Sequence, residues 1–486
     1  MPANKIGKYM EISIKKAACI SAASKYSAIF LNLIFTAVLA RILSPEDYGI
    51  VAVAAVFTTF FGLFADMVIG AGIIQNKELS RNEVDGIFTF SVKLAIVLSF
   101  VFALFSYPLS LFYRNPAYVP IGLLLSASLF FNTLNIVPNA LLLKEKRFLS
   151  IGLRTVLICA LSGIAGIMLA LCGTKYYALV WQALFNAFFI FLWNFISTKP
   201  RFLRTPCASG MRKIKGYSSF VFGFNVINYF ARNSDSLTIS RFLGTASLGY
   251  YDKAYRLMCY PMQNLTHVIT PVLHPILSEH QDDKAYIYEQ YMRIVKVLSL
   301  LGAFITAFCF FAGDEIIFLL FGKKWAASAP CFRFMSVSIW AQMATSSSGS
   351  IFQSLGDTKR MFVVGLANSV LAVCAVVLGI MKSDIHAVAR NIGVVYNLHF
   401  FTTYITLIHF SFGMSFRSFL ARFVPDFVAM GALFVGGFVV DGLLKRTGIM
   451  NAVGKCGIRF IALSAILLLM LLLFRQVKWP RQDTCK

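Results

Sequence analysis

The sequence predicts an all-α protein that crosses a membrane many times. Of its 486 residues, 58% are hydrophobic and only 14% are charged, whereas soluble domains carry about a quarter charged residues. Apolar blocks of roughly 20 residues recur along the chain, and each is long enough to cross a bilayer core of about 30 Å. Short basic clusters separate these blocks, as in loops that fix membrane topology. We therefore expect about 14 transmembrane helices.

The expected helices follow one another with short connections. The first apolar block, from about residue 17 to residue 43, is too long for a cleaved signal peptide and leads directly into the next. The segment 247–277 is interrupted by charged residues and three prolines, which membrane helices tolerate when neighbours satisfy the freed carbonyl groups. The expected spans are 17–43, 48–74, 87–112, 118–143, 150–172, 176–198, 217–242, 247–277, 288–312, 329–353, 361–381, 387–410, 422–441 and 458–475.

Charge between the spans predicts the topology. Lysine and arginine are about twice as frequent in the connections on the side of the N-terminus as on the other side, which predicts that both termini are cytoplasmic. The longest connection is basic and holds two prolines, and we interpret it as a linker between two halves. The expected parts are a cytoplasmic N-terminus (1–16), an N-lobe of spans 1–6 (17–198), the linker (199–216), a C-lobe of spans 7–12 (217–410), two extra C-terminal spans (411–475) and a cytoplasmic tail (476–486).

Composition excludes several classes of function. The net charge of +24 does not indicate nucleic-acid binding, because the basic residues form short clusters that meet lipid headgroups instead. The ten cysteines include no Cys-x-x-Cys pair and the six histidines show no paired ligand spacing, so we expect no metal or other cofactor. No connection is long enough to fold into a catalytic domain, so we do not expect an enzyme.

Two short matches indicate an internal repeat. Residues 40–43 followed by Gly49 match residues 240–243 followed by Gly249 at an offset of 200, and residues 146–153 match 359–366 at an offset of 213. Because the matches occur in order and at corresponding spans, we expect a six-span unit used twice. An even number of spans makes the two units parallel, related by an axis along the membrane normal.

A polar stripe lies in each of two equivalent spans. Four polar residues spaced by three, four and three share one helix face in the seventh span: Asn225, Asn228, Arg232 and Asp235. The offset of 200 places Lys25 on Asn225 and Asn32 on Arg232. Facing lipid would cost about 2.5–3.5 kcal/mol per central charge. We therefore expect both stripes to face an interior that the two lobes share.

Three segments of the chain resemble the polysaccharide transporter (Wzx-type flippase) family. They are RILSPEDYG at 41–49, FADMVIGAGIIQ at 64–75, and RNSD at 232–235 with RFLG at 241–244 and LGYY at 248–251. This family belongs to the multidrug/oligosaccharidyl-lipid/polysaccharide exporter superfamily, and the sequence is most similar to its colanic-acid and lipopolysaccharide exporter branch. The resemblance implies two six-helix lobes around a central cavity, with two additional C-terminal helices.

The resemblance also implies a function. A protein of this family moves an undecaprenyl-diphosphate-linked oligosaccharide repeat unit across the bacterial inner membrane by alternating access, for lipopolysaccharide, capsule or exopolysaccharide biosynthesis. Its partners would be that lipid-linked glycan, membrane lipids, and the polymerase and other export machinery of the pathway. Because the cavity lies within one chain, we expect a functional monomer. The coupling ion would be a proton or Na⁺.

The implied cargo assigns roles to the polar stripes. Phosphate favours Arg232 and Lys25, since arginine binds phosphate with two parallel hydrogen bonds, and sugar hydroxyls favour Asn32, Asn225 and Asn228. Three alternatives stay open. Arg232 pairs with Asp235, Lys25 reaches the lipid headgroups, and the asparagines bond between helices.

Four further residues are candidates for coupling or gating. Asp66 and Asp235 are candidate proton or sodium sites, and the alternative for Asp66 is an ion pair with Lys25 or Lys93. Asp252 and Arg256, with the neighbouring Lys253, form a candidate gate. We expect Lys93, Lys296 and Arg154 to extend towards the cytoplasmic headgroups; the alternative is that an inward-facing cavity uses them to bind cargo.

Two rival functions remain at this point. An ion-coupled drug exporter of the same superfamily would favour an acidic cavity, whereas these stripes are cationic and rich in amides. A membrane-embedded polysaccharide polymerase or ligase would need a sizeable outer loop with acid–base groups, and the sequence has none.

Overall fold

The computed structural model describes residues 3–75, 79–203, 226, 228–266, 283–446 and 451–473, with side chains over these ranges except at 3–19, 67–75 and 266. Every regular element in the described ranges is a helix, and ten of these helices are long and apolar enough to cross a membrane. The predicted class, an all-helical protein with many membrane spans, is therefore confirmed. The finer division into 14 spans and two six-helix lobes stays a prediction.

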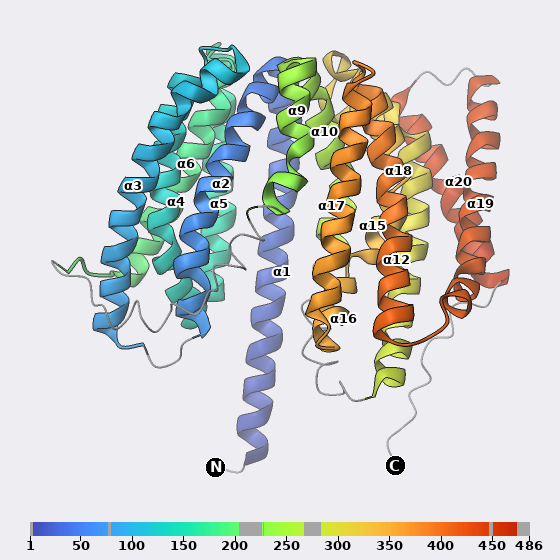
Figure 1. Ribbon diagram of the computed structural model, residues 1–486, viewed down its shortest axis with the longest axis horizontal. Helices are drawn as coiled ribbons and strands as arrows, with labels where there is room; N and C mark the ends of the chain where they lie inside the picture. Colours follow the sequence, from blue (N-terminus) through green and yellow to red (C-terminus); the bar gives the residue numbers. More distant parts are fainter. Residues whose placement is uncertain are drawn as a thin grey trace. The chain divides into compact units, whose positions relative to one another are not determined.

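The chain forms two compact units, Met1–Gly249 and Tyr250–Lys486. The first unit contains the first six expected spans, each within a few residues of its expected position, although the first helix begins far earlier (Figure 1). Most of the expected linker, 199–216, lies outside the described residues. The helices of this unit are α1 (Ala3–Ile42), α2 (Pro45–Gln75), α3 (Arg81–Tyr113), α4 (Tyr118–Lys144), α5 (Phe148–Leu171), α6 (Tyr177–Thr198) and α9 (Ser234–Leu243).

Local sequence explains where the helices of the first unit begin. The hydroxyl of Ser80 accepts a hydrogen bond from the backbone amide of Glu83, whose carboxylate accepts one from the amide of Ser80 in return. This capping box satisfies two amides that the first turn of α3 would leave without partners. Ser44 and Asp47 form the same reciprocal pair at the start of α2. The other carboxylate oxygen of Asp47 accepts from the amide of Tyr176, which ties the α5–α6 turn to α2.

The second unit begins within α10 and ends with two long helices. Its elements are α10 (Thr245–Pro261), η1 (Met262–Thr266), α12 (Lys284–Phe311), α13 (Gly313–Phe321), η2 (Lys323–Trp325), α14 (Ser328–Ser336), α15 (Ile339–Thr345), α16 (Ser348–Ser354), α17 (Thr358–Ile380), α18 (Ile385–Tyr404), η3 (Ile405–Ser411), α19 (Phe416–Arg446) and α20 (Ala452–Leu473). The expected spans 217–242 and 247–277 lie partly outside the described residues.

The expected span at 329–353 is not one helix. It is divided into α14, α15 and α16, and at each break a serine hydroxyl bonds to the backbone carbonyl three residues earlier. Ser338 donates to the carbonyl of Met335 at 2.7 Å, and Ser346 donates to the carbonyl of Met343 at 2.7 Å. The amide of Trp340 next to the first break donates to the hydroxyl of Thr306 in α12. The neighbouring α12 thus satisfies one backbone amide that an unbroken helix would satisfy itself.

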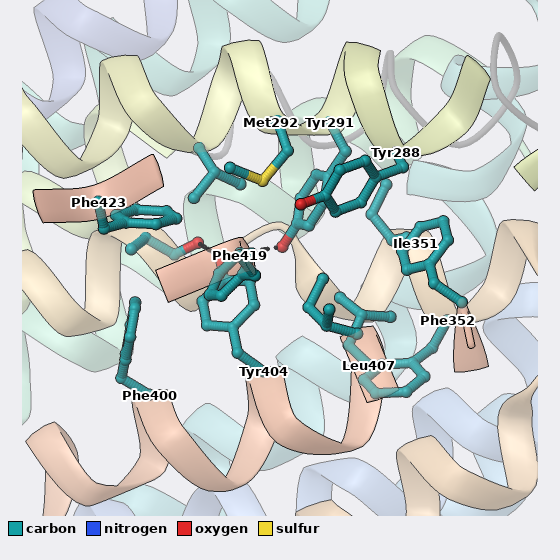
Figure 2. Close-up of a cluster of buried hydrophobic side chains, with 14 of the residues drawn as sticks. Tyr288, Tyr291, Met292, Ile351, Phe352, Phe400, Tyr404, Leu407, Phe419 and Phe423 are labelled. Atoms are coloured by element: carbon teal, nitrogen blue, oxygen red, sulfur yellow. Dashed lines mark hydrogen bonds between the residues drawn. The ribbon is translucent and has the colours of Figure 1, made fainter. Parts of the chain in front are cut away.

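An aromatic core joins four parts of the second unit. Tyr291 of α12, Tyr404 of α18 and Phe419 of α19 are fully buried, and Figure 2 shows their rings packed together with those of neighbouring residues. The hydroxyl of Tyr404 donates to the carbonyl of Ala344 in α15 at 2.7 Å. It therefore accepts the hydrogen bond from Tyr291, at 3.1 Å. Buried tyrosine hydroxyls with partners fix the positions of these helices relative to one another.

The internal repeat with an offset of 200 is visible within the first unit. The break between α1 and α2 falls at Ser44, and the break between α9 and α10 falls at Gly244. A Cβ at Gly49 would collide with the carbonyl oxygen of Thr245, and a Cβ at Gly249 would collide with that of Pro45. Since 45 corresponds to 245 and 49 to 249, the contact is reciprocal, as expected of elements related by a twofold axis.

The second sequence match has the wrong register. The turn at 145–147 and the turn at 355–357 have the same conformation, and their central residues, Lys146 and Gly356, have φ of 55° and 69°. The structural offset is therefore 210, and the pairing of 146–153 with 359–366 at an offset of 213 is wrong by three residues. The error arose because both segments contain a Lys-Arg pair, Lys146-Arg147 and Lys359-Arg360, and these pairs lie at different positions relative to their turns.

Candidate functional site

Two polar residues of α1, Lys25 and Asn32, are exposed within the described part of the chain. Another side of α1 packs on α5, where Gly152 lies against Ser24 and Gly163 lies against Phe35. Lys25 and Asn32 are exposed, and at 100° per residue they lie about a quarter of a turn from this contact. Lys25 forms no ion pair with the residues that the structure describes. Lys25 and Asn32 therefore share one exposed side of α1, and the predicted interior between two lobes stays a prediction.

The second polar stripe is only partly described. Asn225 lies outside the described residues, Asn228 is half-buried and Arg232 is exposed. Helical geometry is interrupted at Asn233, and α9 begins at Ser234, so the stripe does not follow one straight helix. Asp235 is buried in the first turn of α9, where its carboxylate accepts from the amide of Ser236 at 2.7 Å.

Arg232 has no carboxylate partner in the described part of the chain. This includes Asp235, so the alternative in which Arg232 only neutralises that residue is not supported.

The neighbouring aromatic residues explain how the segment that carries Arg232 is held. The hydroxyl of Tyr229 donates to the carbonyl of Val56 at 2.5 Å, and the ring of Phe230 lies 4.6 Å from that of Phe60. Aromatic side chains thus face α2, while Asn228 and Arg232 share the other side of the segment.

Asp66, the candidate coupling residue of α2, is exposed. It forms no ion pair among the described residues, and the two lysines considered as its partners, Lys25 and Lys93, are also exposed. The expected fixed salt bridge is therefore not formed in this conformation. An exposed carboxylate on an apolar helix requires contact with water or with a cation.

Asp252 and Arg256 form an ion pair within α10. The Nε of Arg256 lies 2.7 Å from Oδ2 of Asp252, one helical turn away, and the Arg256 side chain is 62% exposed. Lys253 lies on a different face, where it is buried with its ammonium group over the rings of Phe321 and Trp325. The pair therefore stabilises one helix as it stands, and its role in gating stays a prediction.

Two buried arginines have partners that the sequence did not predict. Arg459 lies 2.6 Å from a carboxylate oxygen of Glu315 and 2.5 Å from one of Asp441, so it clamps α20 to α13 and α19. Arg154 was expected to extend to the headgroups, but it is buried between α4 and α6. The only sequence signal for either residue was a lone arginine inside an apolar block.

Comparisons with known proteins identify relatives over most of the chain. A family model described as "Polysaccharide biosynthesis protein" matches residues 38–330. The chain is 24% identical to the lipopolysaccharide biosynthesis protein WzxC of Escherichia coli (strain K12), over 87% of each chain. It is 22% identical to the succinoglycan biosynthesis transport protein ExoT of Rhizobium meliloti (strain 1021), over 75% of this chain and 74% of ExoT.

Solved structures show the same fold. A structure of the lipid II flippase MurJ in an inward closed conformation has a TM-score of 0.71 at 12% identity, and it covers 94% of this chain and 99% of its own. An inward-facing MATE family multidrug resistance transporter has a TM-score of 0.59 at 14% identity, over 88% of this chain and 99% of its own. At these identities the likeness concerns the fold alone.

Proposed function

The chain belongs to the polysaccharide biosynthesis protein family, which includes the Wzx-type transporters, and we propose that it flips an undecaprenyl-diphosphate-linked oligosaccharide repeat unit across a bacterial inner membrane. It is a transport protein and not an enzyme. Two curated relatives are named for lipopolysaccharide biosynthesis and for succinoglycan transport, and the fold is shared with a lipid II flippase. The repeat unit would serve lipopolysaccharide, capsule or exopolysaccharide biosynthesis.

One observation carries this proposal. Arg232 and Asn32 are exposed at equivalent positions of the repeat, each 12 residues before the breaks at Gly244 and Ser44. At 1.5 Å per residue, Asn32 lies about 18 Å along the axis of α1 from the break at Ser44, deep in a bilayer core of about 30 Å. Arg232 holds the equivalent position of the repeat, just before the interruption at Asn233. A cation at that depth without a carboxylate partner is stable only next to water, another protein group or an anionic ligand. A cavity that binds a diphosphate supplies such surroundings.

The proposed mechanism is alternating access by a monomer with 14 spans and two six-helix lobes. Arg232 and Lys25 bind the diphosphate, and Asn32, Asn225 and Asn228 bind sugar hydroxyls, while the isoprenoid tail stays in the lipid. Asp66 and Asp235 bind the coupling ion, a proton or Na⁺, and Asp252 and Arg256 form a gate. Both termini are cytoplasmic, and the polymerase and other export machinery receive the flipped unit.

The test replaces Arg232 and measures flipping. Arg232→Ala should lower the rate at which lipid-linked oligosaccharide appears on the outer face by tenfold or more, since a charge-assisted hydrogen bond contributes about 1.5–3 kcal/mol. Arg241→Ala is the matched control, because Arg241 lies on α9 with its guanidinium over the Phe112 ring. An unchanged rate in Arg232→Ala, with normal insertion, would contradict the assignment.

A drug exporter is the second candidate, and the exposed carboxylate of Asp66 favours it. An acidic group of this kind suits an organic cation, and the fold is also that of a multidrug resistance transporter. Measuring uptake of an organic cation into everted vesicles, alongside flipping of a lipid-linked glycan, separates the two. Cation uptake that depends on Asp66 and is unaffected by Arg232→Ala would favour the exporter.

A further inference from the structure

A buried arginine in the first unit has amides around it but no acid. Arg154 is 7% exposed. Its Nη1 donates to the side-chain oxygens of Asn139 in α4, at 3.2 Å, and of Asn194 in α6, at 2.5 Å. The amide nitrogen of Asn194 in turn donates to the oxygen of Asn135, at 2.7 Å. No carboxylate lies within ion-pair distance of Arg154 in the part of the chain that the structure describes.

Amides solvate this charge without neutralising it. Burial of an ion costs several kcal/mol unless an opposite charge and hydrogen bonds compensate. The other deeply buried arginine, Arg459, has two carboxylates within 2.6 Å. The positive charge of Arg154 is therefore not compensated by a carboxylate, and one anion bound next to it would be stabilised.

The unused edge of the guanidinium has the geometry for an oxyanion. Nη1 is occupied by the two amides, whereas Nε is buried without a partner, and no hydrogen bond from Nη2 is formed in the described part of the chain. Nε and Nη2 point to the same side of the planar group, and this edge binds two oxygens of a phosphate with parallel hydrogen bonds. The amides of α4 and α6 hold Nη1, so they orient this edge in advance.

Arg154 lies near one end of α5, a few ångströms inside the hydrocarbon core and within side-chain reach of the phosphate layer of a membrane. Arg154 lies six residues after Phe148, the start of α5, which is about 9 Å along the axis. The 24 residues of α5 span about 36 Å, more than a hydrocarbon core of about 30 Å. With the N-terminus inside, this end of α5 is cytoplasmic.

We propose that Arg154, Asn139 and Asn194 form a binding site for the phosphate group of a lipid in the cytoplasmic leaflet. The inference rests on the topology of the proposed function, but not on flipping itself. The phosphate belongs either to the lipid-linked diphosphate before it is flipped or to a phospholipid headgroup. Phosphate oxygens meet Nη2 first and engage Nε when the atoms that cover it move aside.

The experiment measures lipid binding by the full-length protein in detergent, using native mass spectrometry. The probes are undecaprenyl diphosphate, phosphatidylglycerol and undecaprenol, which lacks phosphate. Arg154→Gln keeps a shorter hydrogen-bonding side chain and removes the charge together with both Nη groups, so it should weaken binding of a phosphate-bearing lipid by about tenfold or more. Binding of undecaprenol should not change.

A matched control removes a nearby arginine of the same helix end. Arg147 precedes α5, is exposed, and donates to the carbonyl of Ser197, so Arg147→Gln tests general attraction of anionic lipid. Equal binding by Arg154→Gln and Arg147→Gln would overturn the proposal and leave Arg154 as a structural clamp. Loss confined to undecaprenyl diphosphate would identify the lipid-linked cargo, and loss for both phosphate lipids would identify headgroups in general.

A second variant keeps the arginine and tests the charge directly. Asn139→Asp places a carboxylate where the amide oxygen lies 3.2 Å from Nη1, so the protein supplies its own anion. We expect weaker binding of phosphate lipids with unchanged or higher thermal stability. Unchanged lipid binding would overturn the proposal even if Arg154→Gln failed to fold. Lipid binding through Arg154 in a protein that did not flip glycans would refute only the proposed function.

Discussion

The turns that precede α5 and α17 lie 210 residues apart and have the same backbone. Lys146 and Gly356 occupy the same place in these turns, with φ of 55° and 69°. Lysine adopts this left-handed conformation at a cost of roughly 1–2 kcal/mol, whereas glycine adopts it freely. The repeat has therefore kept the backbone conformation while the residue that adopts it has changed.

The residues that follow Lys146 and Gly356 in the chain differ in charge between the two turns. Arg147 donates to the carbonyl of Ser197, at 2.9 Å. In the equivalent turn, Asp357 accepts from the hydroxyl of Ser411, at 2.7 Å. Each turn is tied to the end of the following helical hairpin, but by a cation in one repeat and by an anion in the other. Equivalent positions in the two repeats thus share geometry and not charge, so the roles of Asn32 and Arg232 need not be the same.

The largest loss of stability is expected at Gly49 and Gly249, where the backbones of the two repeats contact each other. Gly49→Ala and Gly249→Ala each place a methyl group against a backbone carbonyl, which should lower the free energy of unfolding by about 1–3 kcal/mol. Because the contact is reciprocal, the two losses should be similar in thermal unfolding of the purified protein. Gly365→Ala is the control, since a Cβ there meets nothing within 4 Å. Clearly unequal losses would mean that the contact is not symmetric.

An exchange across the repeat tests the turns themselves. Gly356→Lys should lower the free energy of unfolding by about 1 kcal/mol, and Lys146→Gly should raise it by up to about 1 kcal/mol, because only glycine adopts this φ freely. Steric overlap would not cause the loss in Gly356→Lys, since nothing lies within 4 Å of a Cβ at Gly356. Chemical unfolding of both variants should therefore show changes of opposite sign. Changes of the same sign would refute the equivalence at an offset of 210.

The smallest effect concerns the charge that distinguishes the two turns. Burial raises the pKa of Asp357, but hydrogen bonds from Ser411 and Arg360 outweigh it and hold this pKa below its ordinary value. A lowered pKa stabilises the fold above the unfolded value of about 3.9 and loses that stabilisation as the pH falls below it. Asp357→Asn should therefore lower thermal stability slightly at pH 7 and flatten its decline between about pH 5 and pH 3.

A comparison with the other turn controls this measurement. Arg147→Gln changes the equivalent position without removing a carboxylate, so the acid part of the stability profile should keep its slope. If Asp357→Asn also left that slope unchanged, the hydrogen bonds from Ser411 and Arg360 would contribute nothing to the acid sensitivity of the fold.

Hydrophobic length made the first six spans predictable, but it did not predict how the later ones break. The apolar block at 329–353 is as long as a membrane helix, yet it forms three helices, with serines bonded to nearby carbonyls at the breaks and Thr306 accepting from a freed amide. That partner is distant in sequence. The same applies to Arg154, whose amide partners come from two other helices.

The sequence by itself determined the membrane class, the family and the repeat with an offset of 200. Each depends on a local property: the length of an apolar run, a motif, or a glycine that a close backbone contact requires. Only the tertiary structure decided which polar side chains are exposed, which are buried and with what partner. Lys25 and Arg154 are both lone cations in apolar blocks, but one is exposed and the other is enclosed by amides. Each helix is rotated about its axis so that one of these side chains is exposed and the other is buried. Packing between segments that are distant in sequence determines that rotation.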